Sequence, residues 1–115
     1  MSTPTVCAIV LDYYGAEKTK KCLLSLIGQG LKTVYILDNS QKNEAATTLR
    51  QAVDQLRVKG PDFDLEVISA GLNLGFGKGV NFVIAHDKQT ASPHDYYLLL
   101  NNDAVAGPGI RATSG

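Results

Sequence analysis

The chain has 115 residues, of which 44% are hydrophobic and 19% charged, and these values predict one globular domain rather than a disordered chain. Eleven Lys and Arg balance eleven Asp and Glu, so no net charge would attract nucleic acid or an anionic membrane. The apolar run from Val6 to Leu11 is too short to span a membrane, and no positively charged segment precedes it as in a secretory signal. We therefore expect a cytoplasmic domain without a transmembrane segment.

The first half of the chain predicts two strands and the helix between them. The run from Val6 to Leu11 is uninterrupted, and Asp12 to Gly15 closes it, as expected of a strand buried on both faces. Apolar residues at helical spacing predict a helix from Ala16 to Gln29. A second strand, Thr33 to Leu37, follows and ends in the polar residues 38–40.

The second half continues the alternation of strands and helices. The predicted elements are a helix from about Asn43 to Lys59, a strand from Asp64 to Ser69, a glycine-rich loop from Ala70 to Gly79, a short helix from Val80 to about Lys88, and a strand from Tyr96 to Leu100. Such an order predicts an α/β fold: a parallel, Rossmann-like sheet with right-handed crossovers and flanking helices.

The cysteines and histidines do not indicate a metal centre. Cys7 lies inside the first apolar run and Cys22 on an apolar helix face, so we expect two buried thiols rather than a disulfide. No spacing of Cys and His suggests zinc. His86 lies near a helix end and His94 in a loop, and we expect both to be solvated.

Polar residues follow several of the predicted strands. In a parallel sheet all strands end at one edge, and ligands of open α/β sheets bind outside that edge. Here it would carry Asp12, Asp38, the loop from Ala70 to Gly79, and the residues from Asn101 to Asp103. We therefore expect a ligand site at this edge.

The glycine-rich loop does not match the strict phosphate-binding patterns. Val80 occupies the last glycine position of the dinucleotide fingerprint, and Leu72 and Gly79 occupy required positions of the P-loop. Glycines at 71, 75, 77 and 79 are consistent with close approach of a ligand to the backbone, or with turns and tight helix packing. Lys78 could contact a phosphate or be an ordinary exposed lysine.

Two acids at strand ends also have two interpretations. Asp103 could hold a divalent cation whose other ligands are water and a diphosphate, or it could form a turn with Asn102. Asp38 could accept hydrogen bonds from a base or ribose, or cap the following loop with Asn39 and Ser40.

Four stretches, taken together, resemble the family 2 glycosyltransferases of GT-A fold, and among them the rhamnosyltransferase-like branch. The stretch AIVLDYYGAEKTKKCLLSLIGQ is similar to the family's opening strand and helix, and VYILDNS to its second strand. NLGFGKGVN resembles its donor-pocket loop, and LLLNNDAV a divergent DXD motif. The resemblance follows the chain in order over nearly its whole length.

The resemblance implies an inverting glycosyltransferase that binds a nucleotide-diphosphate sugar, a dTDP- or UDP-sugar, with Mg²⁺ or Mn²⁺, and transfers the sugar to a hydroxyl of a glycan or lipid-linked acceptor. Asp103 is implied as the metal ligand and Asp38 as the acid that reads the base. The implied donor-binding residues are Tyr13, Asp38, Asn73, Gly75, Phe76, Gly77, Lys78, Asn101 and Asn102.

The chain departs from the family pattern in three regions. Tyr14 stands where the family usually has Asn, Lys18 and Thr19 replace aromatic and aliphatic residues, and Asn101 replaces an acid. After Ala106 we find no candidate general base and predict no further strand. We therefore expect residues 1–115 to be the nucleotide-sugar-binding part of a truncated glycosyltransferase, lacking the acceptor-binding half and inactive alone, with its catalytic base elsewhere.

Two other classes of protein remain open from the residues. One is a non-catalytic nucleotide-binding or self-associating α/β module, because an unpaired sheet edge favours a homo-oligomer. A more distant one is a signalling receiver domain, which also gathers acids at a parallel edge. That class fits poorly, since the third predicted strand ends in Ser69, Ala70 and Gly71.

Overall fold

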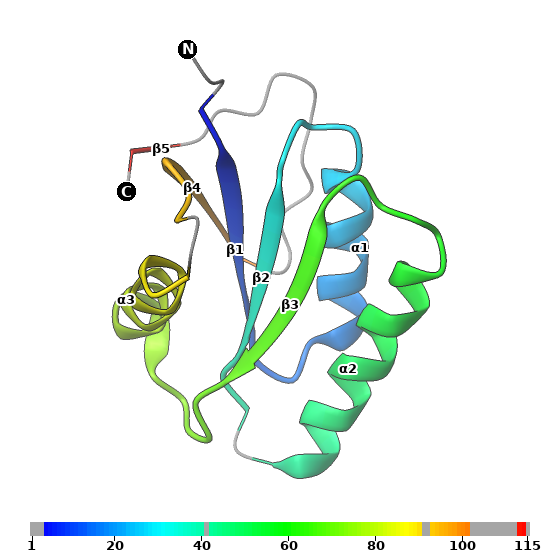
Figure 1. Ribbon diagram of the computed structural model, residues 1–115. Coiled ribbons are helices and arrows are strands. Elements are labelled where there is room, and N and C mark those ends of the chain that lie inside the picture. The colour runs from blue at the N-terminus through cyan, green and yellow to red at the C-terminus, as the bar shows by residue number, and fades with distance from the viewer. Residues whose placement is uncertain (1–3, 41, 91–92, 102–112, 115) are drawn as a thin grey trace.

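The fold is an α/β sandwich built on one sheet (Figure 1). The computed structural model describes residues 4–40, 42–90, 93–101 and 113–114. The elements in chain order are β1 (Val6–Asp12), α1 (Ala16–Leu26), β2 (Thr33–Asp38), α2 (Asn43–Arg57), β3 (Asp64–Ser69), α3 (Gly75–Lys88), β4 (Tyr96–Asn101) and β5 (Thr113–Ser114).

The sheet has the strand order β3-β2-β1-β4-β5, and the first four of these strands are parallel. This is the order of a Rossmann half, and it differs from the 2-1-3-4-5 order of receiver domains, so the receiver alternative is wrong. The prediction that no strand follows Ala106 is also wrong, because the two-residue β5 pairs antiparallel with β4 through Tyr97 and Thr113.

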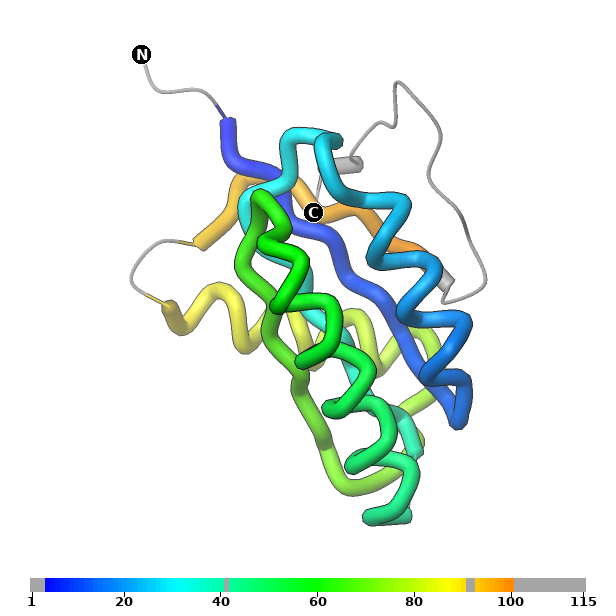
Figure 2. The backbone as a smooth tube through the Cα atoms, turned by 90° about the vertical axis from the view of Figure 1, so that its right-hand side faces the viewer, coloured from blue at the N-terminus to red at the C-terminus, as the bar shows by residue number. Residues whose placement is uncertain are grey.

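The helices cover both faces of the sheet. Helices α1 and α2 lie side by side on one face, and α3 lies on the other (Figure 2). Alternate residues of β1 and β2 divide between two cores: Val10 and Ile36 pack beneath α1 and α2, while Ile9 and Leu37 pack beneath α3. Burial on both faces explains why these strands read as continuous apolar runs.

The prediction of two buried free thiols is confirmed by the structure. Cys7 and Cys22 are free and buried, and burial raises the pKa of the Cys7 thiol far above its ordinary value. None of the helices in the described ranges has the length and apolar character needed to cross a bilayer.

Helix α3 begins five residues earlier than predicted. The side-chain oxygen of Asn73 accepts a 2.8 Å hydrogen bond from the Gly75 N–H, and the helix starts there rather than at Val80. Gly77 and Gly79 therefore lie inside the helix. A Cβ on Gly79 would come within 2.8 Å of Leu37 Cδ2, so this glycine lets α3 pack closely on the sheet.

The other boundaries differ by a few residues at most. Helix α1 ends at Leu26 rather than Gln29, and α2 ends at Arg57 rather than Lys59. Each helix is followed by a glycine with positive φ, Gly28 at 84° and Gly60 at 65°. Three strands extend one residue further than predicted, so the polar residues at positions 12, 38 and 101 are their last members.

A buried polar cluster fixes the C-terminal end of α3 to the sheet. The fully buried Asp87 carboxylate accepts 2.6 Å hydrogen bonds from the phenols of Tyr35 and Tyr97, and bonds from the backbone N–H (2.9 Å) and Nδ1 (2.7 Å) of His94. The Nε2 atom of His94 in turn lies 2.9 Å from Thr33 Oγ1. Asp87 thereby joins α3 to β2, to β4 and to the segment before β4.

This cluster corrects the prediction that both histidines are solvated. The His94 side chain is 6% exposed and bonded through both ring nitrogens, whereas the His86 side chain is 40% exposed and lies 3.0 Å from Glu66. Burial by itself would raise the pKa of Asp87, but the hydrogen bonds from Tyr35, Tyr97 and His94 outweigh it and lower that pKa to about 2.

We expect Asp87→Asn to lower the free energy of unfolding at neutral pH by about 3 kcal/mol, because an amide offers fewer acceptors to the donors around it. The lowered pKa of the Asp87 carboxyl means that its ionisation stabilises the fold above the ordinary value of 3.8, and that this contribution is lost as the pH falls through about 2. Urea unfolding at neutral pH and at acid pH measures the effect.

The stability difference between wild type and Asp87→Asn should shrink by about 2 kcal/mol at the acid pH. Glu17→Gln, a neutralised acid on the exposed start of α1, is the matched control and should show no such change. A difference between wild type and Asp87→Asn that stays constant with pH would contradict the assignment.

Candidate functional site

The carboxyl ends of the parallel strands meet at one edge of the sheet. In register, Leu11 is opposite Asn101, Asp12 is opposite Asp38, and Asp38 is opposite Ser69. From β1 the chain continues to β2 and β3 on one side of β1, and it then returns to form β4 on the other side of β1. The strand order therefore reverses between β1 and β4. Ligands of open α/β sheets bind at such a switch point. Helices α1, α2 and α3 all begin at this edge, at the bottom of Figure 1.

The acid at the end of β1 is buried and hydrogen-bonded. Asp12 is 2% exposed, and its carboxylate accepts a 2.5 Å bond from the hydroxyl of Thr19, one turn into α1. Its backbone oxygen accepts a 2.8 Å bond from the Asn39 N–H. Asp12 therefore holds the loop after β1 against both α1 and the end of β2.

Asp38 has the same character at the end of β2. One carboxylate oxygen accepts bonds from the N–H (2.9 Å) and hydroxyl (2.6 Å) of Ser40, and the other accepts a 3.2 Å bond from the hydroxyl of Ser69. The alternative in which Asp38 caps the following loop is confirmed by these bonds, and the contact to Ser69 also ties β2 to β3. Contact with a base or ribose stays a prediction.

The start of α3 is tied to the same edge. The side-chain oxygen of Asn39 accepts a 3.3 Å bond from the Leu74 N–H, so the end of β2 positions the first turn of the helix. This turn contains no acidic residue. Gly75, Phe76, Gly77 and Lys78 are exposed there. The positive end of the helix dipole and its unpaired N–H groups are suited to an anion.

Two helical glycines in α3 differ in what surrounds them. Gly79 is packed against the sheet, whereas no atom lies within 4 Å of the position that a Cβ on Gly77 would take. Packing thus explains glycine at 79 and leaves glycine at 77, in the first turn, without a structural reason, although glycine is a poorer helix former than alanine. Gly75, at φ 74°, needs glycine for its backbone conformation.

Exposed aromatic rings stand beside the switch point. Tyr13 and Tyr14 are 59% and 45% exposed, and their rings meet edge to face with centroids 4.6 Å apart. Tyr14 has φ 55°, a left-handed conformation that Asn adopts more readily than Tyr.

These tyrosines line two hollows that share Tyr14, Ala16 and Thr48. The larger measures about 470 Å³ and the smaller about 200 Å³, and Asp12 is among the residues that line the smaller. The lining residues of the two are Asp12, Tyr13, Tyr14, Gly15, Ala16, Glu17, Lys18, Ala45 and Thr48. The volume suits a planar group between the aromatic loop and the first turns of α1 and α2.

The predicted metal ligand lies outside the described residues, as does Asn102. Asn101 ends β4 at the switch point, so the chain leaves the sheet next to the end of β1. Within the described ranges no group of three or more His, Cys, Asp or Glu side chains could hold a metal ion. The predicted cation site at Asp103 stays a prediction.

Sequence reasoning missed part of this edge. Thr19 was noted as a departure from the family pattern, but its bond to Asp12 was not foreseen, nor was the contribution of Ala45 and Thr48 from α2. One signal for Thr19 was present, because a polar residue lay among the apolar residues on the inner side of a helix. Ala45 and Thr48 carried no such signal, since their place depends on how α2 packs against α1.

Comparisons with known proteins bear on the fold. No protein-family model matches the chain, and no curated protein matches it in sequence. Its structure is similar to that of the mannosyltransferase PcManGT from Pyrobaculum calidifontis, solved in complex with GDP-Man and Mn²⁺, with a TM-score of 0.68 and 17% sequence identity. The match covers 91% of this chain and 29% of that one. The parallel α/β fold predicted from sequence is thus confirmed.

Proposed function

We propose that this chain is the nucleotide-sugar-binding part of an inverting glycosyltransferase of the rhamnosyltransferase-like kind. The observation that carries the proposal is the hollow beside the exposed Tyr13 and Tyr14, at the point where the strand order reverses between β1 and β4. The fold it shares with a mannosyltransferase that was solved with GDP-Man and Mn²⁺ supports the same conclusion.

The aromatic hollow is the proposed place of the nucleoside. A base can stack on an exposed tyrosine ring, and such stacking contributes about 1 to 3 kcal/mol in other proteins. Asp38 is buried and already accepts three hydrogen bonds, so we propose that it contributes to base or ribose recognition chiefly by holding Ser40 in place. The donor nucleotide is proposed to be UDP or dTDP.

The start of α3 is the proposed place of the diphosphate. Backbone N–H groups of its first turn point out of the helix end, and Lys78 adds a positive charge beside them. Glycine at Gly77 would let phosphate oxygens approach the backbone without meeting a Cβ. Asn73 would fix this turn through its bond to the Gly75 N–H.

Asp103, together with Asn101 and Asn102, is proposed to complete the site after β4 and to hold Mg²⁺ or Mn²⁺. Such a cation, when bound, neutralises charge that develops on the diphosphate as it leaves. An inverting transfer also needs a base to take the proton of the attacking hydroxyl. No described residue is proposed for that role, so we expect this chain alone to bind the donor and to transfer little or no sugar.

We expect Tyr13→Ala to weaken binding of UDP or dTDP by about tenfold, because the base would lose its stacking partner. Isothermal titration calorimetry in the presence of Mn²⁺ measures the change. Tyr96→Ala is the matched control, since Tyr96 is 37% exposed but lies at the start of β4, at the opposite end of the sheet. Equal affinities for the two variants would contradict a nucleoside site at Tyr13.

The proposed cation site has its own test in the same calorimetry. Nucleotide binding that no longer depends on Mn²⁺ in Asp103→Ala would support that site.

We expect Gly77→Ala to change nucleotide affinity and the stability of the fold in opposite directions. The substitution should raise the free energy of unfolding by up to about 1 kcal/mol, because Ala favours the helix and nothing lies near its Cβ. It should weaken nucleotide binding by about tenfold if phosphate oxygens contact this backbone. Urea unfolding and calorimetry on the same sample give both values, and unchanged affinity would rule out contact at Gly77.

A further inference from the structure

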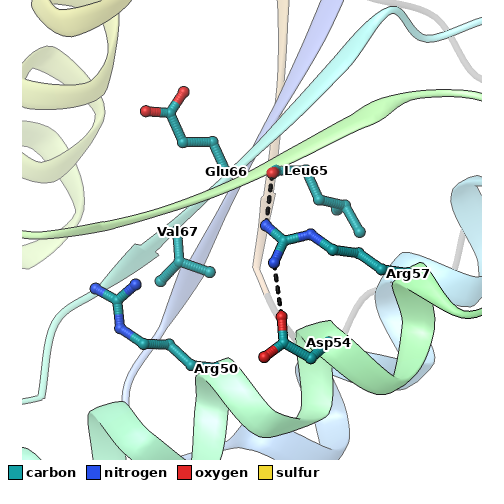
Figure 3. A pocket seen from close by; sticks show the side chains of 6 residues that line it. All are labelled: Arg50, Asp54, Arg57, Leu65, Glu66 and Val67. Atoms are coloured by element: carbon teal, nitrogen blue, oxygen red, sulfur yellow. Dashed lines mark hydrogen bonds and ion pairs between the residues drawn. The ribbon is translucent and has the colours of Figure 1, made fainter.

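The outer edge of the sheet forms another hollow, distinct from the two beside Tyr14. Strand β3 pairs with β2 and with no other strand that the structure describes. Beside it, α2 and β3 enclose a groove of about 360 Å³ (Figure 3). Its walls are Arg50, Asp54, Arg57, Leu65, Glu66 and Val67. It lies midway along the strand, away from the carboxyl edge where the nucleotide site is proposed.

The free backbone groups of β3 can be assigned to particular residues. The Asp64 N–H donates to the Lys32 oxygen on the β2 side, whereas the Leu65 oxygen points outward and accepts a 2.8 Å bond from Arg57 Nη2. Because N–H and C=O groups alternate sides along a strand, those of Val67 also point outward. Val67 therefore offers one donor and one acceptor to an incoming strand.

The charges around this groove are uneven. Arg57 already has two partners, since its Nη1 lies 2.7 Å from Asp54 Oδ1 and its Nη2 donates to the Leu65 backbone oxygen. Glu66 points away from α2, toward His86 on the other face (Figure 3). Arg50 extends from α2 beside Val67 and has no hydrogen-bond or ion-pair partner among the described residues. The groove thus retains one uncompensated positive charge.

A second copy of this chain would be a poor occupant of the groove. Among the antiparallel pairings of two β3 strands about a two-fold axis, those centred on Glu66 and on Val67 overlap the most residues. The first places the two Glu66 side chains opposite each other, and the second places the two Val67 side chains opposite each other, each in a groove that already holds Arg50. Like charges placed opposite each other destabilise strand pairing.

We propose that the β3 edge binds an extended acidic peptide segment of another protein by strand addition. Backbone hydrogen bonds to Val67 supply the pairing, and a carboxylate on the side facing α2 pairs with Arg50. The neighbouring residue of the peptide on that side is apolar, because the half-buried Leu65 and Val67 form the floor of the groove. This inference does not depend on the proposed glycosyltransferase function.

The test uses a fluorescein-labelled peptide of alternating Thr and Val with a central Asp, and fluorescence anisotropy as the readout. We expect saturable binding to the wild-type chain, and loss of binding in Val67→Pro. Proline at this position removes the outward N–H without removing a bond to β2, so the fold should be kept, and circular dichroism checks this.

A double-mutant cycle tests the charge pair. Replacing the Asp of the peptide by Asn should weaken its binding to the wild-type chain about fivefold. The same replacement should leave its affinity for the Arg50→Gln variant unchanged. Lys88→Gln, on α3, is the matched control and should behave as wild type.

Three results would overturn the proposal: no saturable binding, equal binding by wild type and Val67→Pro, or an Asp-to-Asn effect that persists in Arg50→Gln. A dimer in light scattering that Val67→Pro abolishes would also overturn it, in favour of self-association at this edge.

Discussion

The parallel pairing of β1 with both β2 and β4 is the constraint on which the rest of the structure depends. It puts the ends of these strands at one edge and makes the chain leave the sheet on both faces there. Helices α1, α2 and α3 then necessarily begin at that edge, because each crossover returns along the sheet. An aromatic loop, a helix start rich in glycine and the end of β4 are gathered there although they are distant in sequence.

Within this edge the residues that hold the frame together differ from those proposed to bind the ligand. The acids that end β1 and β2 are 2% exposed and are hydrogen-bonded within the protein, where they hold the loops in place. The exposed groups are those on the loops themselves, Tyr13 and Tyr14 after β1 and Gly77 and Lys78 at the start of α3. Buried residues that fix the loops in this way let a rigid scaffold position the exposed groups that would contact a ligand. The Asp87 cluster does the same at the other end of α3 and carries no proposed ligand.

Local patterns predicted the element order, the parallel sheet and the edge at which the polar strand ends meet, because strands buried on both faces and amphipathic helices leave clear signals. They misplaced the start of α3, since four glycines indicate a loop unless the bond from Gly75 to Asn73 and the packing of Gly79 are known. They also misjudged His94, whose partners Asp87 and Thr33 come together only when β2, α3 and the segment before β4 are assembled. The metal site remains a prediction, because Asp103 lies outside the described residues.

The most direct test of the central claim is backbone amide chemical-shift mapping during titration with UDP and Mg²⁺. We predict that the shifts concentrate at the loop from Tyr13 to Ala16 and at the first turn of α3, from Gly75 to Lys78. A hollow of about 430 Å³ at the opposite end of the sheet, lined in part by Lys32, Thr33 and His94, serves as the internal reference and should not respond. Shifts confined to that opposite hollow, or no shifts at saturating UDP, would contradict a nucleotide site at the carboxyl edge.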